Sequence, residues 1–319
     1  MAAIETFSLA KSYQVGFWRK RERAALCPLT ITVQEGEVFG YLGPNGAGKT
    51  TTLKLLMGLI FPTSGTASIL GCPLDDPKMK AQIGFLPEQP YFYDYLTARE
   101  LLNYLAALSG IPAGDRKQRV ETVLRRVGMH EQADLQLRKF SKGMLQRVGI
   151  AQAIVHNPKL IFLDEPMSGL DPIGRREVRD LIQALKDEGK TIFFSTHILS
   201  DAETLCDRVA VLNHGQLRGI GVVADLVREV SGKIEVVWEG AAAVGAIIEL
   251  GAQTHSSGAI FRAVLPEALL ERAVDAIRRN SSRIISLTPV RATLEDFFLE
   301  RLQQEGETGS RAASGKGAS

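Results

Sequence analysis

The stretch VFGYLGPNGAGKTTTLKLLM, residues 38–57, decides the fold of this chain. It joins an apolar run that predicts a buried strand, a turn that matches G-x-x-x-x-G-K-[ST], and a periodicity that predicts a helix over 50–59. The glycines allow backbone N–H groups to face inward, and the start of the helix adds positive potential. This succession predicts a phosphate-binding loop and makes a chance glycine turn a poor explanation.

The polar residues of this loop have distinct expected roles. Lys49 supplies a point charge for the β- and γ-phosphates of a nucleotide, and the Thr50 hydroxyl suits Mg²⁺. The other residues expected to contact the nucleotide here are Gly43, Asn45, Gly46, Gly48 and Thr51.

A second apolar run, Leu160 to Leu163, leads directly into two acids, Asp164 and Glu165. Ligands of open α/β sheets bind at the carboxyl ends of the strands, which is where these acids fall. We expect Asp164 to hold Mg²⁺, directly or through water, and Glu165 to act as a general base on the attacking water. Taken alone, the pair would be interpreted as a solvated turn, but the phosphate loop favours a site.

Composition places the chain among ordinary globular proteins. It has 319 residues, 45% hydrophobic and 23% charged, which excludes a disordered or collagen-like chain. Its net charge of +2 gives little attraction to nucleic acid, so no nucleic-acid partner is expected. The length suits two domains.

The cysteines and the apolar segments indicate a cytoplasmic chain. Cys27, Cys72 and Cys206 form no C-x-x-C pair, so neither a disulfide framework nor a zinc site is expected. The start of the chain lacks the pattern of a signal peptide. The most apolar window, residues 241–252, is shorter than the roughly 20 residues that span a bilayer. We therefore expect the chain not to cross a membrane by itself.

The order of strands and helices predicts an α/β core followed by a smaller α+β domain. Strands and helices alternate up to about residue 221, which predicts a parallel sheet covered on both faces. Residues 97–129 are mainly helical, with Leu108 on an apolar face, and form an insertion into this core. From about residue 231 the order β-α-β-β-α-β suggests a ferredoxin-like domain. The predicted domains are 1–225, with the insertion at about 90–150, then 226–304, and a disordered tail at 305–319.

Several further motifs in the same order resemble those of the ATP-binding-cassette ATPases, over about residues 4–221. The segment Phe140-Ser141-Lys142-Gly143-Met144 is similar to the signature motif of that family, and Ser168-Gly169-Leu170-Asp171 is similar to its dimer-contact loop. The remaining matches are Tyr13, Gln89 after Pro87-Glu88, and His197 at the end of an apolar strand. Lys142 and Met144 replace the usual glycine and glutamine of the signature, which leaves the role of Lys142 open.

The resemblance implies a set of ligands and roles. The cofactors would be ATP and Mg²⁺, with Tyr13 stacked on the adenine and Gln89 near the metal or its water. His197 would contact the γ-phosphate beside the base Glu165. Ser141 and Gly143 would bind the ATP held by the opposite subunit, because a signature motif at a helix start is a second anion site.

The resemblance further implies the ATP-hydrolysing subunit of an export-type transporter. Two ATP molecules would be enclosed between this chain and a second copy of it, or a similar subunit. The dimer would drive separate membrane permease subunits from the cytoplasmic face of the membrane, as a peripheral protein. One alternative is a non-transport cassette ATPase of DNA repair or ribosomes, which usually carries a long coiled coil or two cassettes. Another is a small-molecule kinase, which would need no signature motif.

Two aromatic segments allow more than one interpretation. Tyr91, Phe92, Tyr93 and Tyr95 either receive a short permease helix or fill the core of the helical insertion. The basic and aromatic run at residues 17–23 is best explained as a solvated hairpin loop, and contact with anionic lipid or the permease is the alternative.

Overall fold

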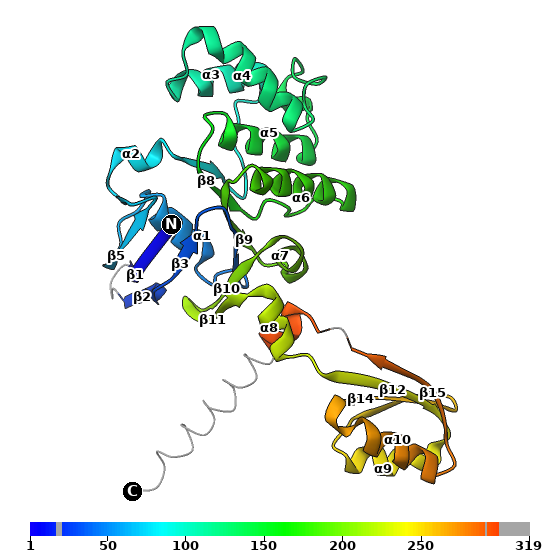
Figure 1. Cartoon of the computed structure of the whole chain (residues 1–319). Helices are drawn as coiled ribbons and strands as arrows, with labels where there is room; N and C mark the ends of the chain where they lie inside the picture. The colour runs from blue at the N-terminus through cyan, green and yellow to red at the C-terminus, as the bar shows by residue number, and fades with distance from the viewer. Residues whose placement is uncertain (17–20, 291, 300–319) are drawn as a thin grey trace, which may run out of the picture. The chain divides into compact units, whose positions relative to one another are not determined.

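The computed structural model describes residues 1–16, 21–290 and 292–299. These residues form two compact units, the first ending at Val222 and the second beginning at Val223, and each is described by itself (Figure 1). The tail predicted at 305–319 lies outside the described residues.

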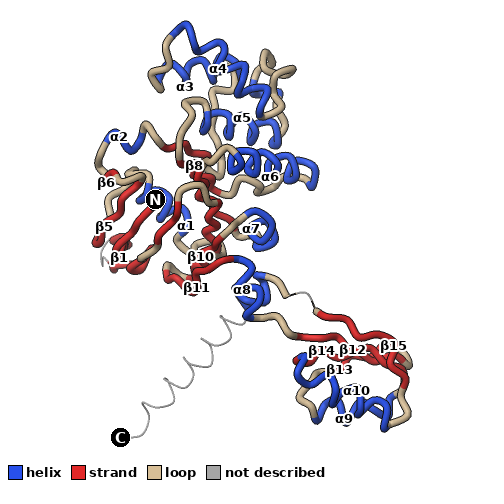
Figure 2. Tube along the Cα trace, viewed as in Figure 1, coloured by secondary structure: helices blue, strands red, loops and turns tan. Residues whose placement is uncertain are grey.

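The centre of the first unit is a mainly parallel sheet with the strand order β11-β10-β4-β9-β8-β7. Only β11 runs antiparallel among these strands, against β10. Every residue of β4, β8 and β9 is buried, as expected where helices cover both faces of a sheet (Figure 2). The predicted parallel sheet is therefore confirmed. Its strands are β4 (Val38–Leu42), β7 (Ile83–Leu86), β8 (Leu160–Asp164), β9 (Thr191–Thr196), β10 (Arg208–Asn213) and β11 (Gln216–Val222).

A second, antiparallel sheet carries the N-terminal strands of this unit. Its order is β2-β1-β5-β6, with β3 also paired to β1. Apolar side chains from this sheet, from the central sheet and from α1 (Lys49–Leu56) form one continuous core, which holds α1 between the sheets. The strands are β1 (Ala2–Val15), β2 (Arg21–Leu29), β3 (Thr32–Gln34), β5 (Ser64–Ile69) and β6 (Cys72–Pro73).

Helix α1 ends three residues before the predicted boundary at 59. Gly58 adopts φ 63°, and its N–H donates to the Leu55 carbonyl at 2.9 Å, while the Leu59 N–H donates to the Lys54 carbonyl at 2.9 Å. This pair of hydrogen bonds is a Schellman motif, which closes a helix where glycine takes the left-handed conformation. The apolar periodicity continues past this stop, and for that reason it overestimates the helix.

The helical insertion consists of α3, α4, η1 and α5 (Figure 1). Gly110 and Pro112 divide the predicted helical region, because glycine takes φ 79° there and proline precedes the first turn of α4. Leu108 was predicted to lie on an apolar face of the insertion. That prediction is wrong, because Leu108 is 66% exposed. The helices of this unit are α2 (Pro77–Lys80), α3 (Ala98–Leu108), α4 (Ala113–Arg126), η1 (Leu137–Lys139), α5 (Lys142–Ile154), α6 (Pro172–Asp187) and α7 (Leu199–Leu205).

The second unit is built on an antiparallel sheet with the order β13-β14-β12-β15. Its elements follow the predicted β-α-β-β-α-β order, with the fully buried Trp238 in the core under α9 and α10. A final helix at 294–299 buries Leu294 and Phe297. The elements are α8 (Val223–Glu229), β12 (Lys233–Glu239), η2 (Ala241–Ala243), α9 (Val244–Glu249), β13 (Thr254–Ser257), β14 (Ile260–Pro266), η3 (Glu267–Leu269), α10 (Leu270–Arg279) and β15 (Arg283–Pro289).

Within the described part of the chain, no helix combines the length and the apolar character needed to span a membrane.

Candidate functional site

The loop between β4 and α1 wraps around the side chain of Lys49. This side chain is 6% exposed, and its Nζ donates to the carbonyl of Gly43 at 2.7 Å and to that of Pro44 at 3.4 Å. Gly48 adopts φ 108°, and a Cβ there would lie 2.5 Å from the Ala25 carbonyl oxygen. Only glycine therefore fits between this loop and the neighbouring strand.

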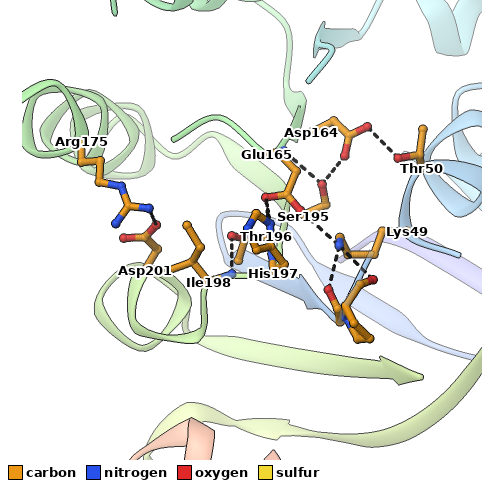
Figure 3. A network of polar contacts seen from close by, with 12 residues as sticks. Lys49, Thr50, Asp164, Glu165, Arg175, Ser195, Thr196, His197, Ile198 and Asp201 are labelled. Carbon is orange, nitrogen blue, oxygen red and sulfur yellow. Dashed lines mark hydrogen bonds and ion pairs between the residues drawn. The ribbon is translucent and has the colours of Figure 1, made fainter. Parts of the chain in front are cut away.

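Asp164 ends β8 beside the loop, and hydroxyl groups from two other elements hold its carboxylate. Thr50 Oγ1 donates to Asp164 Oδ2 at 3.1 Å, and Ser195 Oγ donates to Asp164 Oδ1 at 2.5 Å (Figure 3). Burial raises the pKa of this carboxyl above its ordinary value, and the two hydroxyl donors oppose that rise.

Glu165 contacts both Lys49 of the loop and His197, the residue that follows β9. Its backbone takes φ 49°, which is uncommon for a residue with a side chain. Glu165 Oε1 lies 3.1 Å from Lys49 Nζ, and Glu165 Oε2 lies 2.8 Å from His197 Nδ1. Figure 3 shows the resulting chain of polar contacts from Lys49 through Glu165 to His197.

A cavity of about 690 Å³ opens above these residues. One end is the loop, and the other is formed by β1, β2 and the turn between β10 and β11. Tyr13, 41% exposed, presents its ring at this second end, where Lys11 Nζ lies 5.2 Å from the ring centroid. The predicted residues that line the cavity are Tyr13, Asn45, Gly46, Gly48, Lys49, Thr50, Thr51 and Glu165. A cavity with an anion cradle at one end and an aromatic ring at the other suits a nucleotide.

The other predicted residues divide into two groups. Gly43, Asp164 and His197 join the site through the hydrogen bonds described above. The exposed Gln89, together with Ser141 and Gly143, does not line the cavity. Glu88 lines it in place of Gln89.

The Ser141 segment forms the start of a different helix. Ser141 caps α5 by accepting a hydrogen bond from the Met144 N–H at 3.3 Å, and its side chain is exposed. The Lys142 side chain lies against Gly169, so it follows the surface of its own chain. This helix start lies away from the residues that line the cavity.

The aromatic segment after Gln89 lies mostly at the surface. Tyr91 is 94% exposed, and Tyr93 and Tyr95 are also exposed, with ring centroids 5.9 Å apart. Filling the core of the insertion is therefore the wrong interpretation for these three rings. Of the basic run at 17–23, residues 17–20 lie outside the described part of the chain.

Sequence reasoning missed several residues of the site. Arg23 and His214 line the cavity, and Arg23 pairs with Tyr13 across the β1–β2 hairpin. Ser195 holds Asp164, and the buried Asp201 lies 3.9 Å from Arg175 behind His197 (Figure 3). The signal for Ser195 was a polar residue at the end of an apolar strand. Arg23 is placed by the pairing of β1 and β2, His214 by the turn after β10, and Asp201 and Arg175 by helices α7 and α6.

Comparisons with known proteins agree with this geometry. A family model described as ABC transporter matches residues 26–168. The ABC transporter ATP-binding protein sll0415 of Synechocystis sp. is 43% identical, over 97% of this chain and 87% of its own length. The bacitracin transport ATP-binding protein BcrA of Bacillus licheniformis is 47% identical, over 67% of this chain and 68% of its own length.

A solved structure also resembles part of the chain. The dimeric post-hydrolysis state of the ATP-binding cassette MJ0796, bound to ADP and Pi, is 26% identical with a TM-score of 0.63. The match covers 69% of this chain and 98% of that cassette.

Proposed function

The chain belongs to the family of ABC transporter ATP-binding proteins, and on that premise we propose how its residues divide the binding and hydrolysis of ATP. The observation that carries the proposal is the chain of contacts from Lys49 through Glu165 to His197 at the base of the cavity. Lys49 and the loop N–H groups bind the β- and γ-phosphates. Tyr13 stacks on the adenine at the other end.

Glu165 is the general base for the attacking water. Its carboxylate and the γ-phosphate compete for Lys49, so the arrival of ATP breaks the ion pair between Glu165 and Lys49 and frees the carboxylate. His197 stays beside Glu165 and orients it toward the γ-phosphate.

Thr50 and Asp164 would hold Mg²⁺. Their hydroxyl and carboxylate oxygens already lie 3.1 Å apart, and hard oxygen donors in small number fit a cation that is otherwise ligated by phosphate and water. The bound ion would neutralise charge on the transferring phosphate. Gln89, exposed and outside the cavity, would reach the metal or its water after the subunits close.

A second copy of the chain, or a similar subunit, completes the nucleotide site. Ser141 and Gly143 belong to an exposed helix start away from the cavity of their own subunit, so we assign them to the ATP of the opposite one. The dimeric state of the related cassette MJ0796 supports this arrangement.

Separate permease subunits would receive the motion of this dimer at the cytoplasmic face of the membrane. The exposed rings of Tyr91, Tyr93 and Tyr95 offer an apolar surface for a short permease helix. Relatives named as transport proteins favour a role in transport over DNA repair or ribosome-associated roles.

A Glu165→Gln variant tests the proposal. The amide keeps the shape of the side chain but removes the base, while Asp164 and Lys49 remain. We expect ATP with Mg²⁺ to convert this variant from monomer to dimer in size exclusion with light scattering, and Ser141→Arg to abolish the dimer.

If the protein is already dimeric without ATP, retention of ATP through the column replaces mass as the measurement. A Glu165→Gln variant that neither dimerises nor retains ATP would contradict the proposed division of roles.

A further inference from the structure

Ser195 is a buried polar residue near the carboxyl end of β9. Its side chain is fully buried beside Asp164, with which it is in register in the parallel pairing of β8 and β9. The hydroxyl is therefore placed by the sheet itself, not by a flexible loop.

The hydrogen bonds of this hydroxyl join the acids of the site. Ser195 Oγ donates to Asp164 Oδ1 at 2.5 Å and accepts from the backbone N–H of Glu165 at 3.2 Å. A serine hydroxyl has one hydrogen to donate, and here Asp164 receives it. Ser195 therefore contacts the carboxylate of one acid and the backbone of the other (Figure 3).

The Asp164 carboxylate depends on this donor when the metal site is filled. In the structure its oxygens accept from Thr50 and Ser195. Thr50 and Asp164 would hold the cation, so the Thr50 hydroxyl would no longer be free to donate to the carboxylate. Ser195 would remain as a donor to Oδ1 and would limit the rotation of the carboxylate.

The Glu165 backbone depends on Ser195 as well. Its N–H is shared between the Ser195 hydroxyl and the Ser195 carbonyl, which accepts at 3.1 Å. This anchor holds the residue in the left-handed conformation at φ 49°, from which the side chain reaches Lys49 and His197.

We propose that Ser195 is a positioning residue for the metal site, whose hydroxyl aims the Asp164 carboxylate at the cation beside Thr50 while it anchors the Glu165 backbone. The inference rests on the proposed function, because it assumes that Thr50 and Asp164 hold the metal. Hydrogen-bond partners of metal ligands typically change metal affinity by 10–100-fold when they are removed.

A purely structural role for Ser195 makes a different prediction, and β9 offers a matched control for it. Thr191 lies at the opposite end of the same strand, is also buried, and accepts a hydrogen bond from the Gly36 N–H at 2.9 Å. Thr191→Val removes a buried hydroxyl from β9 at a distance from the acids. It therefore measures what the loss of such a group costs the fold alone.

The test measures Mn²⁺ binding to the full-length chain by electron paramagnetic resonance, with a saturating non-hydrolysable ATP analogue. We expect Ser195→Ala to raise the Kd for Mn²⁺ by about tenfold or more and to leave the affinity for the analogue in EDTA unchanged. Thr191→Val should lower Tm without changing the Kd for Mn²⁺. Recovery of Mn²⁺ binding in Ser195→Thr, which restores the hydroxyl, would assign the effect to that group.

The outcomes separate this inference from the proposed function. Wild-type Mn²⁺ affinity in Ser195→Ala, or equal losses in Ser195→Ala and Thr191→Val, overturns the role of Ser195 and leaves the proposed function standing. If the wild-type chain shows no nucleotide-dependent Mn²⁺ site, the assignment of Thr50 and Asp164 fails, and the role of Ser195 fails with it.

Discussion

Glu165 is held in contacts with Lys49 and His197, the side chains beside which it is proposed to act. Its Oε1 faces Lys49 at 3.1 Å, yet this oxygen accepts no hydrogen bond from any described residue. Lys49 donates to the carbonyls of Gly43 and Pro44 at the same time. An ion pair without hydrogen-bond geometry is weaker than one with it, so a phosphate can displace this carboxylate readily.

Gly48 is a residue of the phosphate loop at which even a small side chain would collide with the backbone of a neighbouring strand. An alanine Cβ would lie 2.5 Å from the Ala25 carbonyl, whereas at Gly46, also left-handed, nothing lies within 4 Å of the added atom. We expect Gly46→Ala to cost about 1 kcal/mol from backbone strain. Gly48→Ala should cost clearly more and should weaken ATP binding, as measured by urea unfolding and nucleotide titration. Equal losses in the two variants would contradict the close approach of Ala25.

His156 is expected to make stability fall as pH falls. Its Nε2 lies 2.8 Å from the Ile83 carbonyl, and burial, the largest cause, lowers its pKa below the ordinary value. The unfolded chain therefore binds the proton first, and this stabilisation is lost as pH falls through about 6.5 toward the folded pKa.

We expect Tm to fall less between about pH 7.5 and 5.5 in His156→Gln than in the wild type, because the glutamine amide matches the position of Nε2 and donates to the carbonyl but does not titrate. His255→Gln, at an exposed position of β13, is the control and should behave as the wild type does. An identical pH profile in His156→Gln would contradict the prediction.

Element boundaries depend on local caps that act independently of the site. Helix α3 begins with a capping box, in which Thr97 Oγ1 accepts from the Glu100 N–H at 3.1 Å and Glu100 Oε2 accepts from the Thr97 N–H at 2.8 Å. Such caps stop a helix from fraying because they satisfy N–H groups that lack partners within the helix. The helical insertion thus has a defined start directly after the aromatic segment.

Thr97→Ala should lower the free energy of unfolding by about 1 kcal/mol, since it removes this cap. The matched control is Thr122→Ala on α4, where the exposed hydroxyl only donates to the Gln118 carbonyl one turn earlier. Alanine is the better helix former there, so the control should not destabilise. Urea unfolding of both variants measures the difference, and a larger loss at Thr122 would exclude the cap as the cause.

The whole chain is expected to unfold in more than one step, because each unit has its own core. Trp238 is fully buried in the core of the second unit, and Phe193 is fully buried in the core of the first. Trp238→Ala should destabilise the second unit by about 3–5 kcal/mol. In differential scanning calorimetry one transition should shift while the other, and ATP binding, stay as in the wild type. A common shift of both transitions would show that the units unfold together.

The sequence was sufficient to predict the strand, loop and helix around Lys49. It also predicted the strand before Asp164 and the β-α-β-β-α-β order of the second unit. Each rests on a local pattern, because apolar periodicity and glycine positions act on neighbouring residues. The helix after the loop was overestimated, since the Schellman motif at Gly58 outweighs the apolar period that continues beyond it. The exposure of Leu108 and Tyr91 could not be predicted from the sequence, because it depends on which other segments pack beside them.

The sequence by itself determined which residue types form the site, because the phosphate loop, the acids and the histidine each follow a strand at a recognisable spacing. Only the tertiary structure decided how they meet. Ser195 reaches Asp164 through the register of β8 and β9, and Arg23 joins Tyr13 through the register of the β1–β2 hairpin. Register is set by pairing between segments that are distant in the chain and by the burial of whole sheet faces, so no local pattern contains it.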